Sequence, residues 1–153
     1  MRLLRASSPG RPALDIALSN ALLARVARGE LGPTVRLYRP GPTLAFGRLD
    51  ALRPGFAEAG EAARDAGFEP IVRLAGGHAA AYHELSLIYE EITRESDATA
   101  GALDDAVPSV SVSAVEEAIL AARGRDRALV PAAVDERTLA LARELEARHR
   151  WPI

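Results

Sequence analysis

The stretch Arg73-Leu74-Ala75-Gly76-Gly77-His78-Ala79-Ala80-Ala81-Tyr82-His83-Glu84 decides how this sequence is interpreted. A predicted strand leads into two adjacent glycines, which let the backbone approach a ligand closely and expose its N–H groups. The alanines that follow leave room for a slender group such as an alkyl chain. The arginine offers a planar fork for a carboxylate or a phosphate. The second histidine would hydrogen-bond a carbonyl or the same phosphate.

Each of these features also has an ordinary structural interpretation. A Gly-Gly pair between two strands is typical of a hairpin turn. A single histidine in a strand is more often a satisfied or exposed residue than a catalyst, and alanine runs are common in an alanine-rich protein. The residues alone therefore leave a ligand site and a plain turn open.

Hydrophobic spacing outside this stretch predicts an α+β fold. Leu14, Leu18 and Leu22 follow helical spacing after Pro12, which suits the first turn of a helix. Strands are expected at 34–38 and 43–46, joined as a hairpin, and at 69–73 and 79–92, with a second helix at 54–66. The expected sheet is thus a hairpin plus one long strand, packed with two helices from the first half of the chain.

The sequence changes character after residue 93. Residues 94–107 are small and acidic and lack hydrophobic periodicity, so we expect a linker there. Ser113 and Glu116 have the spacing of a capping box that opens a helix, and a last helix is expected after Pro131. The expected organisation is 1–93, an α+β part; 94–107, a linker; and 108–153, a helical tail.

Composition excludes several classes of function. The net charge of -2 gives no basic stripe for nucleic acid. No apolar run approaches a membrane span and the amino terminus lacks a signal-peptide pattern, so a cytoplasmic protein is expected. The chain has no cysteine, and all 19 basic residues are arginine. It therefore offers neither a thiolate nor a side-chain amine.

His78 and His83 would face opposite sides of a strand, so no built-in metal site is expected.

The quoted stretch resembles the signature of the lipoate-protein ligase and octanoyltransferase family, which shares its catalytic domain with biotin ligases. In that signature an arginine precedes a glycine-rich turn, and the next strand carries an aromatic residue, a histidine and an acidic residue. Two further segments agree in order: Leu14-Asp15-Ile16-Ala17 and Pro42-Thr43-Leu44-Ala45-Phe46-Gly47-Arg48. The resemblance covers residues 1–92.

The resemblance implies a function. The family uses ATP and Mg²⁺ to activate lipoate or octanoate as an acyl-adenylate, and it transfers the acyl group to a lysine of a lipoyl-carrier domain. It also implies six ligand-binding residues for the acyl or acyl-adenylate group, of which the last two would line the acyl pocket: Arg73, Gly76, Gly77, His78, Tyr82 and His83.

Two departures limit what is carried over. His78 and Ala79 stand where the family often has glycine or another small residue. The family's catalytic lysine, which lies on a later strand, has no counterpart. Residues 108–148 resemble the closing helices of the family, so we expect an internal deletion whose seam lies within 97–103.

The expected function is therefore a ligase-like domain that is catalytically impaired alone, with no catalytic residue assigned. The alternatives are a non-catalytic module that binds an acyl or acyl-nucleotide group, and a non-functional remnant. A second chain or a homodimer would complete the sheet.

Overall fold

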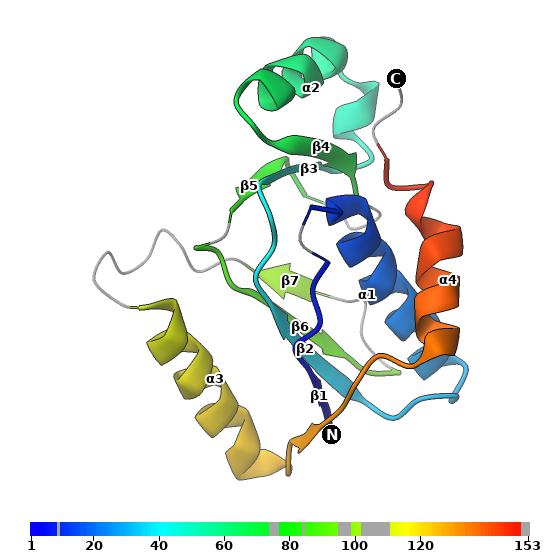
Figure 1. Ribbon diagram of the computed structural model, residues 1–153, viewed down its shortest axis with the longest axis vertical. Helices are drawn as coiled ribbons and strands as arrows, with labels where there is room; N and C mark the ends of the chain where they lie inside the picture. Colours follow the sequence, from blue (N-terminus) through cyan, green and yellow to red (C-terminus); the bar gives the residue numbers. More distant parts are fainter. Residues whose placement is uncertain (9, 74–76, 84, 95–98, 102–110, 151–153) are drawn as a thin grey trace.

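The computed structural model describes residues 1–8, 10–73, 77–83, 85–94, 99–101 and 111–150. Four helices and eight strands are present in these ranges, together with one 3₁₀ turn (Figure 1). In chain order they are β1 (Arg2–Leu4), α1 (Pro12–Ala27), β2 (Thr34–Tyr38), β3 (Thr43–Phe46), η1 (Asp50–Leu52), α2 (Phe56–Asp65), β4 (Glu69–Val72), β5 (Ala80–Tyr82), β6 (Ile88–Ile92), β7 (Thr99–Gly101), α3 (Val112–Asp126), β8 (Val130–Pro131) and α4 (Glu136–Glu146).

The strands form two sheets, so the α+β class is confirmed. The larger sheet has the order β7-β6-β2-β1-β8, and the smaller one has the order β4-β3-β5. In the larger sheet β1 runs parallel to β2 and β8, while β6 runs antiparallel to β2 and β7. In the smaller sheet β3 runs parallel to β4 and antiparallel to β5.

The predicted hairpin of residues 34–46 is wrong, because its two strands belong to different sheets. Tyr38 pairs with Ile88 in the larger sheet, whereas Thr43 pairs with Tyr82 in the smaller one. Two prolines, at positions 40 and 42, interrupt the ladder between them, since proline has no N–H to donate. The connection carries the chain from one sheet to the other instead of turning it back.

The predicted long strand of residues 79–92 is wrong for a related reason. It is split into β5 and β6 by a turn in which Ser86 N donates to the His83 carbonyl at 2.8 Å and His83 N donates to Ser86 Oγ at 3.2 Å. Strand β5 then stays with β3, and β6 pairs with β2. The chain crosses between the sheets twice, from β2 to β3 and from β5 to β6. The two crossings lie beside each other, because Tyr38 pairs with Ile88 and Thr43 pairs with Tyr82.

The main core lies between α1, the larger sheet and α4. Leu14, Leu18 and Leu22 are buried along one side of α1, as their spacing predicts, and they pack with Leu4 and Ala142. A second cluster, which contains Tyr38, Ala45, Ile71, Tyr82 and Ile88, joins the two sheets. Figure 1 shows α1 and α4 side by side, with α3 apart from them.

The two C-terminal helices differ in detail from the prediction. Ser111, not Ser113, caps α3 by accepting from Ala114 N at 3.2 Å. Asp135 caps α4 in the same way, because its Oδ1 accepts from Thr138 N at 2.8 Å. Strand β8 comes before α4 and joins the edge of the larger sheet beside β1.

The predicted linker contains a strand where it is described, since residues 99–101 form β7 on the edge of β6. The domain boundaries and the deletion seam stay predictions. No helix in the described part of the chain is long and apolar enough to cross a membrane.

Candidate functional site

Arg73 lies at the corner where the carboxyl ends of β3 and β4 meet. Phe46 and Val72 are register partners at the ends of these parallel strands. Arg73 N donates to the Phe46 carbonyl at 2.8 Å, which continues the ladder by one residue. Gly47 follows β3 and Arg73 follows β4, so both lie at the same end of the small sheet.

Two glycines touch at this corner. A Cβ on Gly47 would lie 2.4 Å from the carbonyl oxygen of Gly77, so no other residue fits at position 47 without a backbone shift. Gly77 itself has φ of 94°, which favours glycine. Gly47 N donates to Asp50 Oδ2 at 2.9 Å and so fixes the following turn. The contact between residues 47 and 77 joins two loops that are thirty residues apart.

The Arg73 side chain spans the glycine turn. Its Nη2 donates to the His78 carbonyl at 2.7 Å. Its Nε is buried without a hydrogen-bond partner among the described residues. A buried donor without a partner is costly. The structure therefore brings Arg73, Gly77 and the His78 backbone together, while Gly76 lies outside the described residues.

Tyr82 and His83 lie at the other end of β5. His83 follows His78 by five positions, which corresponds to at most about 17 Å of extended chain. Tyr82 is buried in the cluster that joins the sheets. His83 Nδ1 accepts from Leu85 N at 3.1 Å and so takes part in the turn before β6. Their predicted contact with an acyl chain stays a prediction.

The described residues contain no group of three or more His, Asp or Glu side chains that would hold a metal ion. A group of charged side chains is instead buried in the core. Asp15, Ser19, Arg36 and Glu90, here called the buried charge cluster, lie between α1 and the larger sheet. All four are buried.

Arg36 is the centre of the buried charge cluster and has no exposed surface. It donates to Asp15 Oδ1 at 2.7 Å, to the Asp15 carbonyl at 2.9 Å and to Ser19 Oγ at 2.7 Å. Two further bonds go to the Ala6 carbonyl, and its guanidinium stacks 3.7 Å from the centre of the Tyr38 ring. Arg36 is thus fully used inside the fold.

The two carboxyl groups of the cluster differ in their donors. Asp15 Oδ1 also accepts from Ser8 N at 2.9 Å, whereas the Glu90 oxygens accept from the Ser19 hydroxyl at 2.6 and 2.8 Å. Burial raises the pKa of both groups, and Arg36 opposes that shift in both. No sequence-based prediction included this cluster. Its signal in the sequence is charged residues directly beside apolar ones, with Asp15 after Leu14 and Arg36 between Val35 and Leu37.

His149 lies beside β4, on the side of that strand that does not pair with β3. Its backbone carbonyl accepts from Val72 N at 3.0 Å, its Nδ1 lies 2.9 Å from the Val72 carbonyl, and its Nε2 lies 3.0 Å from Asn20 Nδ2. Burial lowers the pKa of the ring, and the charge of Arg148 adds to this, against the Val72 carbonyl. The contacts suit a neutral ring that donates through Nδ1 and accepts at Nε2.

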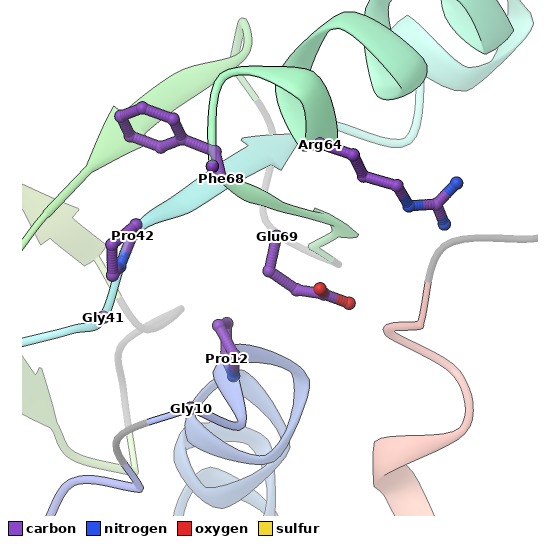
Figure 2. A pocket seen from close by; sticks show the side chains of 8 residues that line it. Gly10, Pro12, Gly41, Pro42, Arg64, Phe68 and Glu69 are labelled. Carbon is purple, nitrogen blue, oxygen red and sulfur yellow. The ribbon is translucent and has the colours of Figure 1, made fainter.

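A cavity of about 440 Å³ lies at the amino ends of β3 and β4, away from Arg73. Figure 2 shows Pro12, at the start of α1, facing Glu69, with Pro42 and Phe68 to one side and Arg64 to the other. The cavity lies between loops and contains no residue that was predicted to bind a ligand.

The fold is similar to that of solved lipoate-protein ligases. A lipoate-protein ligase A bound with ATP matches with a TM-score of 0.68 at 15% identity, over 96% of this chain and 94% of that chain. A candidate lipoate protein ligase from T. acidophilum matches with a TM-score of 0.72 at 14% identity, again over 96% and 94%. A bi-partite lipoate protein ligase with its E2 lipoyl domain, from Thermoplasma acidophilum, matches with a TM-score of 0.65 at 14% identity over 96% of this chain and 92% of that chain.

This protein therefore has a lipoate-protein ligase-like fold, as the resemblance implied. The likeness in structure covers 96% of the chain and so extends beyond residue 92. No family model matches the sequence, and no curated protein matches it.

Proposed function

We propose that this chain is a lipoate-ligase-type domain that binds an acyl or acyl-nucleotide group and does not complete acyl transfer alone. The observation that carries the proposal is the corner at Arg73, where a buried Nε without a described partner lies beside the Gly77 turn. An arginine and a glycine turn together suit a phosphate or a carboxylate. The solved structures with this fold include one bound with ATP and one with lipoic acid.

The residues at the corner fit an anionic acyl-nucleotide better than a resident metal. ATP, when bound, would supply the adenylyl group that activates a carboxylate. Arg73 would hold the anion, and the Gly47–Gly77 contact would keep the turn open to it. The described residues supply no carboxylate cluster for Mg²⁺, so we assign no step to that ion.

The absence of lysine from the sequence supports the second half of the proposal. Charge stabilisation at the reacting group is usually the largest catalytic contribution, and the loss of one donor costs about 10²–10³ in rate. Arginine, which stays protonated, would bind the anion without serving as an amine.

Ligand-dependent stabilisation tests the binding. A non-hydrolysable octanoyl-AMP analogue at 100 times its Kd should raise the free energy of unfolding by about 2.7 kcal/mol, which is a rise of about 5–11 °C in Tm for a chain of this size. Arg73→Ala should abolish the rise, whereas Arg125→Ala, on the exposed side of α3, should keep it. An unchanged rise in the Arg73 variant would remove our assignment of the site.

One half of a two-part ligase is the second candidate. Among the described strands, the smaller sheet ends at β5, which pairs with β3 alone, and one of the similar structures is a bi-partite ligase. Pyrophosphate release from ATP, Mg²⁺ and octanoate separates the two candidates. Release that depends on a second protein from a lysate of the source cells would favour the two-part ligase.

A further inference from the structure

Two of the large apolar side chains that the fold leaves exposed lie on one short turn. Leu49 is 74% exposed and Leu52 is 81% exposed. Single exposed leucines are ordinary on protein surfaces. These two differ because they stand three residues apart, Leu49 as the N-cap and Leu52 as the last residue of the 3₁₀ turn η1, where side chains at i and i+3 eclipse. They therefore point in the same direction as a pair.

The turn that carries this pair is held rigidly by its own hydrogen bonds. Asp50 N donates to the Gly47 carbonyl at 3.1 Å, and Gly47 N donates back to Asp50 Oδ2 at 2.9 Å. Leu52 N and Arg53 N close the next turn, to the carbonyls of Leu49 and Asp50, at 3.2 and 3.0 Å. An apolar pair on a turn that is already ordered loses little conformational entropy when it is covered.

The charges around the pair are arranged asymmetrically. Arg48 and Arg53 are exposed at the two ends of the turn, and neither makes an ion pair with a described residue. Asp50, the one acid within residues 48–53, is directed to the Gly47 backbone. The outward face of residues 48–53, here called the 48–53 turn, is therefore apolar in the middle and positive at both ends.

The 48–53 turn is continuous with the corner at Arg73, because Gly47 precedes it directly and touches the Gly77 carbonyl. Any protein that receives a group bound at that corner must approach this edge of the small sheet. We infer that the 48–53 turn docks an acidic protein surface that has an apolar pocket, and that it thereby positions the acceptor of the acyl group. The inference rests on the function proposed above.

The charges and the size of the patch favour this occupant. Two arginines that flank a leucine pair are complementary to a patch of carboxylates around an apolar pocket, and such complementarity governs the rate and specificity of encounter. A small patch with a central apolar anchor is typical of a weak, transient complex. An acceptor that must leave after each transfer requires such a complex.

An E2 lipoyl domain is the probe, since one similar structure is of a bi-partite lipoate protein ligase and its E2 lipoyl domain; the domain used is one with acidic residues around its acceptor lysine. We expect Leu49→Ser/Leu52→Ser to weaken its Kd at least tenfold by isothermal titration calorimetry. Leu85→Ser is the matched control, because Leu85 is 63% exposed at the far end of β5; it should leave the Kd unchanged. Arg48→Gln/Arg53→Gln should reduce the salt dependence of binding, with Arg125→Gln as the control.

Stabilisation by the octanoyl-AMP analogue, measured on the same variants, keeps the two proposals apart. Loss of lipoyl-domain binding with analogue binding intact supports the docking surface. A wild-type protein that binds the analogue and not the lipoyl domain, or a Leu49/Leu52 variant that binds both as well as wild type, overturns it and leaves the proposed function standing. If wild type binds no analogue, the proposed function fails.

Two other occupants would also overturn the inference. Self-association by analytical ultracentrifugation that the leucine variant abolishes would identify a second copy of this chain. Sedimentation with vesicles of phosphatidylglycerol that the same variant abolishes would identify a membrane surface.

Discussion

A double-mutant cycle on Asp15 and Glu90 tests whether the buried charge cluster shares one negative charge. Arg36 carries one positive charge and is fully buried. Its Nη2 lies 2.7 Å from Asp15 Oδ1, whereas its Nη1 lies 3.6 Å from Glu90 Oε2. Asp15 also has the Ser8 N–H, while Glu90 has the Ser19 hydroxyl. Asp15 Oδ2 has no hydrogen-bond partner among the described residues, but the shorter ion pair and the N–H donor both lie at Oδ1 of the same carboxyl, so we expect Asp15 to be ionised and Glu90 to hold a proton.

This arrangement predicts unequal costs for the substitutions. Glu90→Gln imitates the protonated acid and should change the free energy of unfolding by less than about 1 kcal/mol. Asp15→Asn should cost about 1–3 kcal/mol, because Glu90 can then release its proton and balance Arg36. The double variant leaves Arg36 buried without a counter-ion and should cost about 3–5 kcal/mol. The double variant should thus exceed the sum of the single ones by about 1–3 kcal/mol.

The pH dependence has a definite sign. Burial raises the pKa of Glu90 above the ordinary value of 4.5, so the folded state favours its protonated form. That contribution is complete below pH 4.5 and is lost as the pH rises through the folded-state pKa. The stability of Glu90→Gln relative to wild type should therefore increase with pH.

Urea unfolding at pH 5, 7 and 8.5 measures both effects. Glu91→Gln is the matched control, because Glu91 is the next residue on β6 and pairs with Arg123 at the surface; it should cost less than about 1 kcal/mol. Costs of the two single substitutions that simply add in the double variant would refute the shared charge. A benefit of Glu90→Gln that shrinks with rising pH would refute the assignment of the proton.

Three further predictions concern single residues. Gly47→Ala should destabilise by about 1–3 kcal/mol in urea unfolding and weaken binding of the octanoyl-AMP analogue, because its Cβ would lie 2.4 Å from the Gly77 carbonyl. His149→Gln should remove a loss of stability that wild type shows as pH falls below 6.5, since burial lowers the pKa of that ring in the folded state; urea unfolding at pH 7.5 and 5.5 measures it. Asp135→Ala should lower Tm by at least about 2–4 °C, because the Thr138 N–H loses its cap at a cost of about 1 kcal/mol and the buried Arg25 loses one of its two carboxylate partners.

The sequence predicted many of the elements and not which strands pair with one another. Helix α1 and strands β2, β3 and β4 lie where the sequence pattern predicts them. The assignment of β2 and β3 to separate sheets depends on strands far along the chain. The two prolines between them indicate a break in the ladder, but the local pattern does not identify the strands with which each then pairs. The same holds for the break between β5 and β6, where the bond between His83 N and Ser86 Oγ replaces a continuous strand.

The sequence likewise predicted the part of the candidate site that is local in the chain and not the part that depends on strand pairing. Arg73, Gly77 and His78 are close in sequence, so their proximity was predictable from one short motif. The contact between Gly47 and Gly77 required the parallel pairing of β3 with β4, which spacing does not indicate. Residues of the motif that follow β5 to its far end, such as His83, were grouped with Arg73 by sequence and are separated from it by the length of the strand.

A comparison of two arginines gives the physical basis for placing the site at the corner. Arg36 and Arg73 both follow apolar strand residues and look alike in the sequence. Arg36 makes five hydrogen bonds inside the fold, so removal of its charge should lower the free energy of unfolding. Arg73 keeps a buried Nε without a described partner beside a glycine turn. Arg2 also keeps a buried nitrogen without such a partner, at Nη1, but it lies in β1, away from that turn. Only at the corner do an unsatisfied cation and backbone that suits an anion coincide among the described arginines, so Arg73→Ala should change ligand affinity more than it changes folding.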